Sequence, residues 1–232
     1  MLRVMFRAVI TACALSLGAP AWSCDIALVL AVDVSGSVDR DEYRIQMDGL
    51  AEALRDPSVA DALLVGGAAI AVVQWTGTTR QALSVPWTEV TAPNDLDTLA
   101  RRIEAVPREW RNYSTAIGEA LSFSLTQFET APVCARRVID ISGDGLSNEG
   151  VPPTQIHAQL VDLDVTVNAL VIEGAEPDLT AYFRENVISG AGAFVITANS
   201  YEDYPDRMRR KLLREVSKPV SGRVIPLTGK PM

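Results

Sequence analysis

Short apolar runs alternate with amphipathic stretches along most of this chain. Residues 26–32, 68–75 and 165–172 are predominantly apolar, which is typical of strands buried on both faces of a parallel sheet. Between such runs, apolar residues recur at helical spacing. The clearest example is the series Tyr43, Met47, Leu50 and Leu54. This alternation predicts an α/β fold, a doubly wound and mostly parallel six-stranded sheet with helices on both faces.

The predicted strands and helices divide the chain from residue 26 to residue 216. We expect strands at residues 26–32, 68–75, 81–87, 137–142, 165–172 and 193–198, and helices at residues 40–55, 94–105, 115–128, 154–163, 178–187 and 201–216. Asp39 and Glu42 form a capping-box pattern that predicts where the first helix begins. Pro86 has no backbone N–H for a sheet ladder, so its strand is expected at an edge, antiparallel to residues 68–75.

The N-terminus has the three parts of a secretory signal peptide. Arg3 and Arg7 precede an apolar stretch at residues 8–17, and an Ala-x-Ala pattern ends at Ala21. A membrane anchor is the competing interpretation, but that stretch is about half of the roughly 20 residues that span a bilayer. We therefore expect residues 1–21 to be cleaved and the mature protein to be exported, as a periplasmic or extracellular protein. No later segment of the sequence is apolar for long enough to cross a membrane.

Two cysteines, Cys24 and Cys134, remain once the expected signal peptide is removed. Cys24 lies nine residues before Asp33, and Cys134 lies ten residues before Asp144, so each precedes a predicted strand. If those strands are parallel neighbours, the two thiols meet at the lower edge of the sheet, where an oxidising compartment favours a disulfide. The alternative is that Cys24 is a lipidated N-terminus, although the preceding Ala-Trp-Ser is a poor signal for that modification.

The composition indicates one globular domain without a general affinity for nucleic acid. The chain has 232 residues, of which 48% are hydrophobic, and a net charge of −8. That size supports one domain with a substantial core, which we assign to residues 22–216. Residues 217–232, punctuated by Pro and Gly, are expected to form a flexible tail. The negative charge argues against a nucleic-acid partner.

Some of the other polar side chains are interpreted as ordinary surface positions. His157, the only histidine, is expected on a helix without catalytic partners. A basic cluster lies in the last predicted helix and is expected to form its solvated face, with contact to anionic lipid or a partner as the weaker alternative. The cluster comprises Arg207, Arg209, Arg210, Lys211 and Arg214.

Three oxygen-bearing side chains follow the first predicted strand at alternate positions, namely Asp33, Ser35 and Ser37. Ligands of doubly wound sheets bind where the chain leaves the carboxyl ends of the strands. Carboxylate and hydroxyl oxygens suit hard cations, and Mg²⁺ binds few carboxylates and keeps some of its water. The pattern therefore predicts a Mg²⁺ site, with Mn²⁺ or Ca²⁺ as alternative ions.

Two further side chains are expected at the same edge of the sheet. Thr115 stands at the start of a predicted helix after a polar loop, and Asp144 comes just after the fourth predicted strand. Strands one and four flank the change in strand order of a doubly wound sheet, so both loops face one crevice. The alternative is that these residues cap helices and turns, as Asp, Ser and Thr often do.

These motifs resemble the metal-ion-dependent adhesion site of von Willebrand factor type A domains. The resemblance rests on Asp33-x-Ser35-x-Ser37, Thr115-x-x-Gly118-x-Ala120-Leu121 and Ile141-Ser142-Gly143-Asp144-Gly145. It extends over nearly the whole mature chain, which is similar to an exported bacterial branch of that family whose function is unknown. The resemblance implies a Rossmann-type sheet with strand order 3-2-1-4-5-6 and Mg²⁺ at its upper edge.

The resemblance also implies a role for each site residue. Ser35 and Ser37 would ligate the metal directly, and Thr115 directly or through water. Asp33 and Asp144 would act largely through water. Because neutral hydroxyl groups then dominate the coordination shell, the ion keeps net positive charge, and a carboxylate of a partner protein can complete it.

One departure from the family pattern concerns the loop before Thr115. That loop reads Asn112-Tyr113-Ser114, where small glycines are usual in the family. Ser114 is therefore an alternative to Thr115 as the ligand, and Tyr113 is expected to narrow the site.

Three functions are compatible with these motifs. The leading hypothesis is an exported, monomeric, adhesion-type module, not an enzyme, whose bound Mg²⁺ is completed by an Asp, Glu or terminal carboxylate of a partner protein. The second is a metal-free structural or interaction domain, which Tyr113 would favour. The third is a metal-dependent phosphohydrolase with Asp33 as the phosphoryl acceptor. Against it, Ser35 is not a second carboxylate for acid–base chemistry, and the sequence has neither a nucleophile elbow nor a phosphate-binding Gly-rich loop with Lys.

Overall fold

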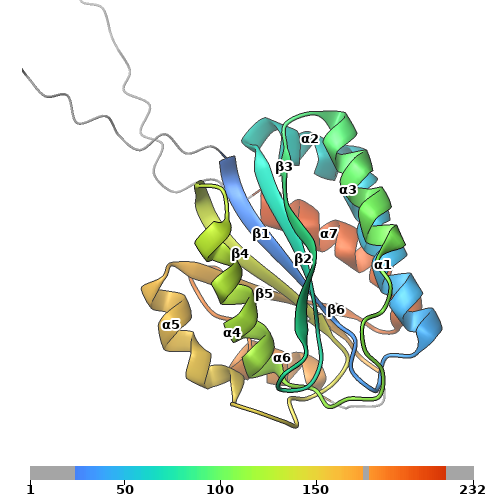
Figure 1. The fold of residues 1–232 in the computed structure, drawn as a ribbon, viewed down its shortest axis with the longest axis vertical. Coiled ribbons are helices and arrows are strands. Elements are labelled where there is room, and N and C mark those ends of the chain that lie inside the picture. The colour runs from blue at the N-terminus through green and yellow to red at the C-terminus, as the bar shows by residue number, and fades with distance from the viewer. Residues whose placement is uncertain (1–23, 175–177, 218–232) are drawn as a thin grey trace, which may run out of the picture.

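The computed structural model describes residues 24–174 and 178–217, coloured in Figure 1. The expected signal peptide, residues 1–21, lies outside the described residues, and so does the expected tail apart from Ser217. The described residues form an α/β structure around one sheet.

The six-stranded sheet has the order β3-β2-β1-β4-β5-β6. Its strands are β1 (Cys24–Asp33), β2 (Ala68–Trp75), β3 (Gln81–Val90), β4 (Cys134–Gly143), β5 (Val165–Ile172) and β6 (Val195–Ala198). Neighbouring strands are parallel, except that β3 pairs antiparallel with β2. The predicted fold class and the strand order implied by the resemblance are therefore confirmed. The strand that contains Pro86 lies at an edge, as predicted, and its pairing with β2 shifts register around that residue.

The helices begin and end close to the predicted positions. They are α1 (Arg40–Arg55), α2 (Pro57–Gly66), α3 (Pro93–Ala105), α4 (Ile117–Gln127), α5 (His157–Asp162), α6 (Leu179–Asn186) and α7 (Tyr204–Val216), with short 3₁₀ turns η1 (Phe128–Thr130), η2 (Pro153–Ile156) and η3 (Tyr201–Asp203). The predicted capping box of α1 is confirmed. The Asp39 carboxylate accepts the backbone N–H of Glu42, and the Glu42 carboxylate accepts that of Asp39.

Helix α2 was not predicted from the sequence. Its N-terminus is stabilised by Asp56, whose side chain accepts hydrogen bonds from the backbone N–H groups of Ser58 and Val59. Pro57 occupies the first helical position. A backbone N–H at that position has no partner within the helix, so a proline costs no hydrogen bond there. The Asp-Pro pair therefore both ends α1 and begins α2.

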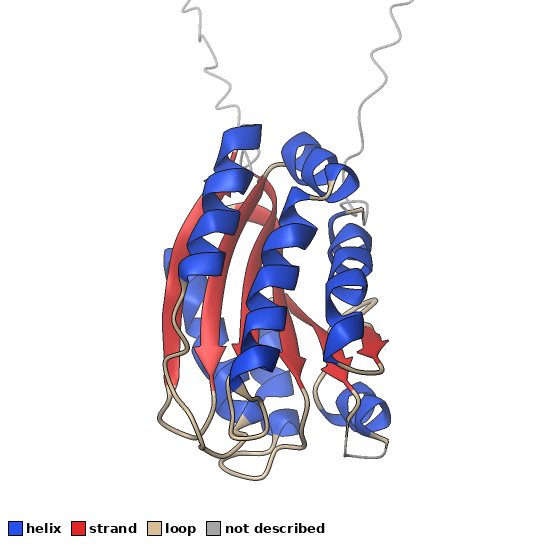
Figure 2. Cartoon of the chain, turned by 90° about the vertical axis from the view of Figure 1, so that its right-hand side faces the viewer, coloured by secondary structure: helices blue, strands red, loops and turns tan. Residues whose placement is uncertain are grey.

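Two helical layers cover the sheet, as Figure 2 shows. In β1, Leu28 and Leu30 join a core with residues of α1, α2, α3 and α7. Val29 and Ala31 join a second core with residues of α4, α5 and α6. Because side chains alternate between the faces of a strand, both faces of β1 are buried. The loops of the candidate site follow the carboxyl ends of the central strands.

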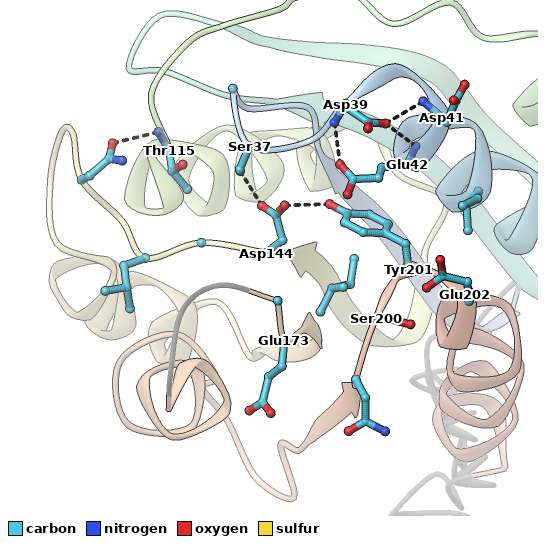
Figure 3. Close-up of a pocket in the computed structure, with 18 of the residues that line it drawn as sticks. Ser37, Asp39, Asp41, Glu42, Thr115, Asp144, Glu173, Ser200, Tyr201 and Glu202 are labelled. Atoms are coloured by element: carbon cyan, nitrogen blue, oxygen red, sulfur yellow. Dashed lines mark hydrogen bonds between the residues drawn. The ribbon is translucent and has the colours of Figure 1, made fainter.

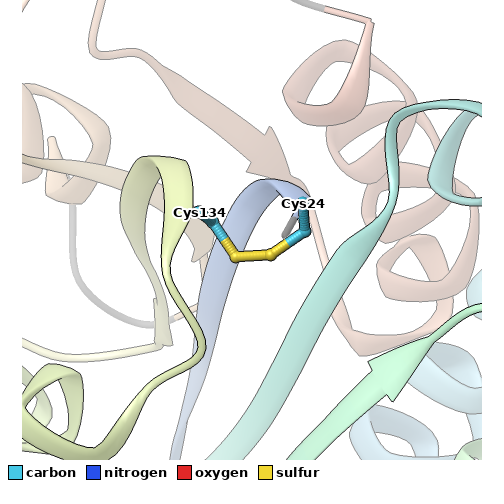
Figure 4. Close-up of a disulfide and its surroundings, with 2 residues drawn as sticks. All are labelled: Cys24 and Cys134. Carbon is cyan, nitrogen blue, oxygen red and sulfur yellow. A yellow bond between two sulfur atoms is a disulfide. The ribbon is translucent and has the colours of Figure 1, made fainter. Parts of the chain in front are cut away.

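The disulfide predicted between Cys24 and Cys134 is present in the structure, as Figure 4 shows. The two residues are register partners on the parallel strands β1 and β4, and their Cα atoms are 4.6 Å apart. That separation lies in the usual range for a disulfide. The bond joins the first residues of the two strands, at the end of the sheet opposite to Asp33 and Gly143.

One member of the basic cluster contradicts the expectation of a solvated helix face. Lys211 is 0% exposed, and its ammonium group is paired with the buried Asp140 of β4. The physical reason is position, since Lys211 lies three residues after Met208 and one before Leu212, on the side of α7 that packs against the sheet. Arg209 and Arg210 do face solvent and pair with Asp206.

Among the described residues, no helix has the length and apolar character needed to span a membrane.

Candidate metal centre

A chain of hydrogen bonds connects the ends of β1 and β4. The backbone N–H of Ser35 donates to Asp33 Oδ1 at 2.7 Å, and the hydroxyl groups of Ser35 and Ser37 are 3.2 Å apart. Ser37 Oγ then donates to Asp144 Oδ1 at 2.6 Å, across 107 positions of sequence. The pairing of Val32 with Ser142 brings these loops together, because it sets the last residues of both strands at the same level.

Thr115 faces the same place from the start of α4. Its side chain is buried and lies beside Gly145. A Cβ atom added to Gly145 would be 3.7 Å from Thr115 Oγ1. The backbone N–H of Thr115 donates to Asn148 Oδ1 at 2.9 Å, which fixes this loop against the loop after β4. Ser114 is exposed, and its carbonyl oxygen accepts the hydroxyl of the buried Thr76. The structure therefore brings Thr115, rather than Ser114, toward the serines and aspartates.

The candidate metal centre, comprising Asp33, Ser35, Ser37, Thr115 and Asp144, opens into a cleft. The cleft has a volume of about 930 Å³, and Ser37, Thr115 and Asp144 are among its lining residues. Figure 3 shows Ser37 and Asp144 pointing toward each other at one side of it. Tyr113 also lines the cleft, and its ring lies 3.7 Å from the guanidinium carbon of Arg80. That Tyr113 narrows the approach to the site stays a prediction.

Asp33 is the electrostatic centre of the arrangement. It is 0% exposed, and its Oδ2 atom has no hydrogen-bond partner among the described residues. Burial, followed by the negative charge of Asp144, raises the pKa of Asp33 to about 7, while hydrogen bonds from Ser35 and from the backbone of Asp144 oppose the shift. A bound cation would remove this penalty, because a nearby positive charge favours the ionised carboxylate. The residues present therefore fit a divalent cation.

The donor set is one of hard oxygen atoms. Within residues 24–174 and 178–217, no cluster of three or more His, Cys, Asp or Glu side chains is arranged to hold a metal. The candidate metal centre instead combines two carboxylates with three hydroxyl groups. Oxygen ligands of this kind suit Mg²⁺, Mn²⁺ or Ca²⁺ better than they suit metals that favour thiolate or imidazole ligands.

Tyr201 is a site residue that the sequence analysis missed. Its hydroxyl donates to Asp144 Oδ2 at 2.8 Å, so that Asp144 is held between Ser37 and Tyr201 (Figure 3). Burial and the charge of Asp144 raise the pKa of Tyr201, which keeps the phenol protonated and able to donate. Only the position of Tyr201 at the start of the last predicted helix was visible in the sequence, and 57 residues separate it from Asp144.

Arg108 is a second supporting residue without a sequence motif. Its Nη2 atom donates to the backbone carbonyls of Val34 and Ser35, at 3.1 and 2.8 Å. The backbone N–H of Gly36 donates to the carbonyl of Tyr113 at 2.8 Å. These contacts fix the loop after β1 against the polar loop before α4, and so hold the serine hydroxyl groups in place.

Comparison with known proteins identifies the family. The family model described as "Protein of unknown function (DUF1194)" matches residues 23–220. The chain belongs to the DUF1194 family. No curated protein matches this DUF1194 chain.

Solved structures similar to the DUF1194 chain are von Willebrand factor type A proteins. Proximal thread matrix protein 1 from the mussel byssus has a TM-score of 0.62 at 20% identity, over 84% of this chain and 49% of that protein. A von Willebrand factor type A protein from Catenulispora acidiphila has a TM-score of 0.60 at 18% identity, over 84% and 44%. BatB from Bacteroides thetaiotaomicron has a TM-score of 0.56 at 14% identity, over 84% and 100%.

These similarities establish the fold of the DUF1194 chain as that of a von Willebrand factor type A domain. The chain spans about half the length of the first two structures, at 49% and 44%. A further structure of the mussel protein is described as having a "zinc occupied MIDAS motif", the metal-ion-dependent adhesion site of that protein. The fold and the family resemblance stated from the sequence are confirmed.

Proposed function

We propose that this DUF1194 protein is an exported protein-binding module that holds a divalent cation, Mg²⁺, at the candidate metal centre. The observation that carries the proposal is the hydrogen-bonded chain from Asp33 through Ser35 and Ser37 to Asp144, with Thr115 facing the same cleft. Three separate loops contribute to it, and two of them follow parallel strands at the sheet edge where such folds bind ligands.

Each residue of the centre has a proposed role. Ser35 and Ser37 would ligate the cation directly through their hydroxyl groups, and Thr115 directly or through water. Asp33 and Asp144 would act mainly through water, and their charges would balance that of the ion. The unpartnered Oδ2 atom of Asp33 supports this assignment, because it is a buried acceptor that a hydrated cation would satisfy.

The proposed partner is a protein that presents an Asp, Glu or terminal carboxylate. When bound, the cation supplies a positively charged coordination position for that carboxylate. Ser37 is exposed, and Asp144 is partly exposed at the cleft, so a partner can approach from that side. The proposed role is therefore binding rather than catalysis, by a monomer in the periplasm or outside the cell.

The similar structures support a metal-dependent interaction rather than a particular partner. The mussel protein carries zinc in its adhesion-site motif, and another similar structure is a pilus adhesin, SpaC from Lactobacillus rhamnosus GG, with a TM-score of 0.59 at 13% identity. For this chain we propose Mg²⁺, because the first ligands are hydroxyl groups and the acidic groups are few.

Titration calorimetry with Mg²⁺ and Mn²⁺ tests the proposed cation. We expect one ion to bind per chain, and we expect Asp33→Ala and Asp144→Ala each to weaken binding by about 10- to 100-fold. Asp41→Ala is the matched control, because Asp41 lines the same cleft outside the hydrogen-bonded chain. The absence of binding heat, or an equal effect of all three substitutions, would contradict the proposed site.

A second experiment tests the adhesive role. Proteins captured from the native cell-envelope fraction in Mg²⁺ should be released by EDTA and should not be captured by Asp144→Ala. Retention of the partner after chelation would contradict cation-dependent binding. Turnover of a generic phosphoester that depends on Asp33 would instead favour the phosphohydrolase.

A further inference from the structure

A second cluster of polar side chains lies inside the molecule, between α7 and the sheet. Asp140 of β4 and Asn168 of β5 are register partners on adjacent strands. Lys211 and Glu215 lie one turn apart on α7 and reach the same two strands. These four side chains, the buried quartet, are at most 2% exposed.

The contacts within the buried quartet form a continuous path. Lys211 Nζ is in ion-pair contact with Asp140 Oδ1 and lies 3.9 Å from Glu215 Oε2. Asn168 Nδ2 donates to both carboxylate oxygens of Glu215, at 2.7 and 2.9 Å. The ring centroid of Phe194 lies 5.4 Å from Lys211 Nζ. An amine, a carboxyl group and a second carboxylate therefore meet beside an aromatic ring, away from solvent.

The pairing of Lys211 with Asp140 is fully buried. The ammonium group contacts Asp140 Oδ1, and Asp140 Oδ2 has no hydrogen-bond partner among the described residues. A buried ion pair needs additional hydrogen bonds to offset the hydration that both charges have lost. Asp140 Oδ2 lacks such a bond, and the amine lies in direct contact with the carboxyl group.

Burial also favours the uncharged form of Asp140. It raises the pKa of Asp140, and the positive charge of Lys211 opposes that shift. Proton transfer from the ammonium to the carboxylate within the pair would give an amine and a carboxylic acid, and would remove both charges from the interior. A desolvated lysine amine is a nucleophile.

We propose that Lys211 and Asp140 condense into an intramolecular amide, an isopeptide bond that joins α7 to β4. The bond from Nζ to Cγ of Asp140 forms, and one Cγ–Oδ bond breaks. The amine gives up one proton and the carboxylic acid its hydroxyl group, which leave together as one water molecule. No electrons are transferred, and no cofactor or external reactant is consumed.

The fold supplies what this condensation needs. Reacting groups that a fold holds in contact can reach an effective concentration of about 10⁵ M or more. Glu215 is the acid–base group, which takes the proton from Nζ and returns it to the departing oxygen. Asn168 hydrogen-bonds both oxygens of Glu215 and so sets the direction of that carboxylate.

Intact-mass spectrometry of the purified exported protein tests the proposal. After reduction and denaturation, the mass is expected to be lower by one water molecule than the mass calculated for the chain from its measured N-terminus. Lys211→Met and Asp140→Ala should show no such loss, and Glu215→Gln should show a smaller fraction of cross-linked chain. Asp206→Ala is the matched control, because it removes an exposed carboxylate of the same helix, and it should keep the full loss.

Peptide mapping of the wild-type protein locates the bond without relying on a variant that folds. A lysine in an amide bond resists trypsin, so one branched peptide should contain both Lys211 and Asp140. A wild-type mass equal to the calculated value, with both residues in separate peptides, would overturn the proposal. A loss of one ammonia molecule would overturn the assignment to Asp140, because it would place the bond on Asn168.

Discussion

The candidate metal centre and the buried quartet contain similar chemical groups but differ in their access to solvent. The centre follows the ends of β1 and β4 and opens into a cleft of about 930 Å³. The quartet joins the middle of β4 and β5 to α7, and its members are at most 2% exposed. Asp144 lines the cleft, so it can contact ions or molecules from solvent. Asp140 is buried in the middle of β4, so it can contact only neighbouring side chains of the fold. Substitutions should therefore change binding at the centre and stability at the quartet.

The largest expected effect is on the quartet. Lys211→Met removes the link between α7 and Asp140, leaves a buried carboxyl group without its partner, and should lower the free energy of unfolding by about 3–5 kcal/mol. Arg209→Met, on the exposed side of the same helix, should change it by less than about 0.5 kcal/mol. Urea unfolding followed by circular dichroism measures both values. If Mg²⁺ affinity falls together with stability in Lys211→Met, the two clusters are coupled and are not independent parts of the molecule.

The disulfide at the far end of the sheet gives the next largest effect. Replacing both Cys24 and Cys134 with serine should lower the free energy of unfolding by about 2–5 kcal/mol, because the cross-link closes a long loop. Mg²⁺ affinity of the folded variant should not change, since the disulfide and Asp33 lie at opposite ends of β1. Thermal unfolding with and without reductant provides the measurement, and unequal Mg²⁺ affinities would count against this separation.

Asp33 should link stability at the centre to pH. Its pKa is about 7 in the folded protein, against an ordinary value of 3.8 for an Asp side chain. The folded state then holds a proton that the unfolded state has released, so stability without Mg²⁺ should fall as pH rises from about 4 to 7 and level off above that. Mg²⁺ at 100 times its dissociation constant should restore about 2.7 kcal/mol. Its affinity should fall as pH is lowered through 7, because protons compete for Asp33.

Asp33→Asn isolates this effect. The variant removes the buried charge and keeps the shape, so at pH 8 without Mg²⁺ it should melt at a higher temperature than the wild type. It should gain less stability from Mg²⁺ than the wild type gains. Differential scanning calorimetry at pH 5 and pH 8 gives both results, and a wild-type stability that rises with pH over this range would refute the assignment of Asp33.

A smaller effect decides between the two candidate hydroxyl ligands. Thr115 is buried at the cleft and Ser114 is exposed. Thr115→Val should weaken Mg²⁺ binding about tenfold, as expected for the loss of one polar interaction with a charged group. Ser114→Ala should leave the affinity unchanged. Calorimetric titration of both variants makes the comparison, and the reverse outcome would assign the role to Ser114.

The smallest effect is expected at Tyr201. Tyr201→Phe removes the hydrogen bond to Asp144 Oδ2 and keeps the ring. The net value of such a bond is about 1 kcal/mol, so Mg²⁺ affinity should fall about threefold to tenfold. Tyr204→Phe, a buried tyrosine of α7 that does not line the cleft, serves as the control. Equal affinities of Tyr201→Phe and the wild type would remove Tyr201 from the centre.

The elements that could be predicted were those whose signal is local. The apolar runs gave the six strands, and the capping box of Asp39 and Glu42 located the start of α1. Helix α2 was missed, because the Asp-Pro signal that ends one helix also begins the next. Lys211 was assigned to solvent because charged residues surround it in sequence, and only packing against β4 reveals its partner.

The amino-acid sequence was enough to predict the six strands, all helices except α2, the disulfide as the favoured pairing and the residue types of a hard-cation site. Each of these depends on spacing along the chain or on the chemistry of a short motif. Contacts in the folded protein were needed to show that Thr115 rather than Ser114 lines the cleft, that Tyr201 donates to Asp144, and that Lys211 meets Asp140 in the interior. These contacts join residues far apart in sequence, and their geometry depends on strand register and on which side of a helix packs against the sheet.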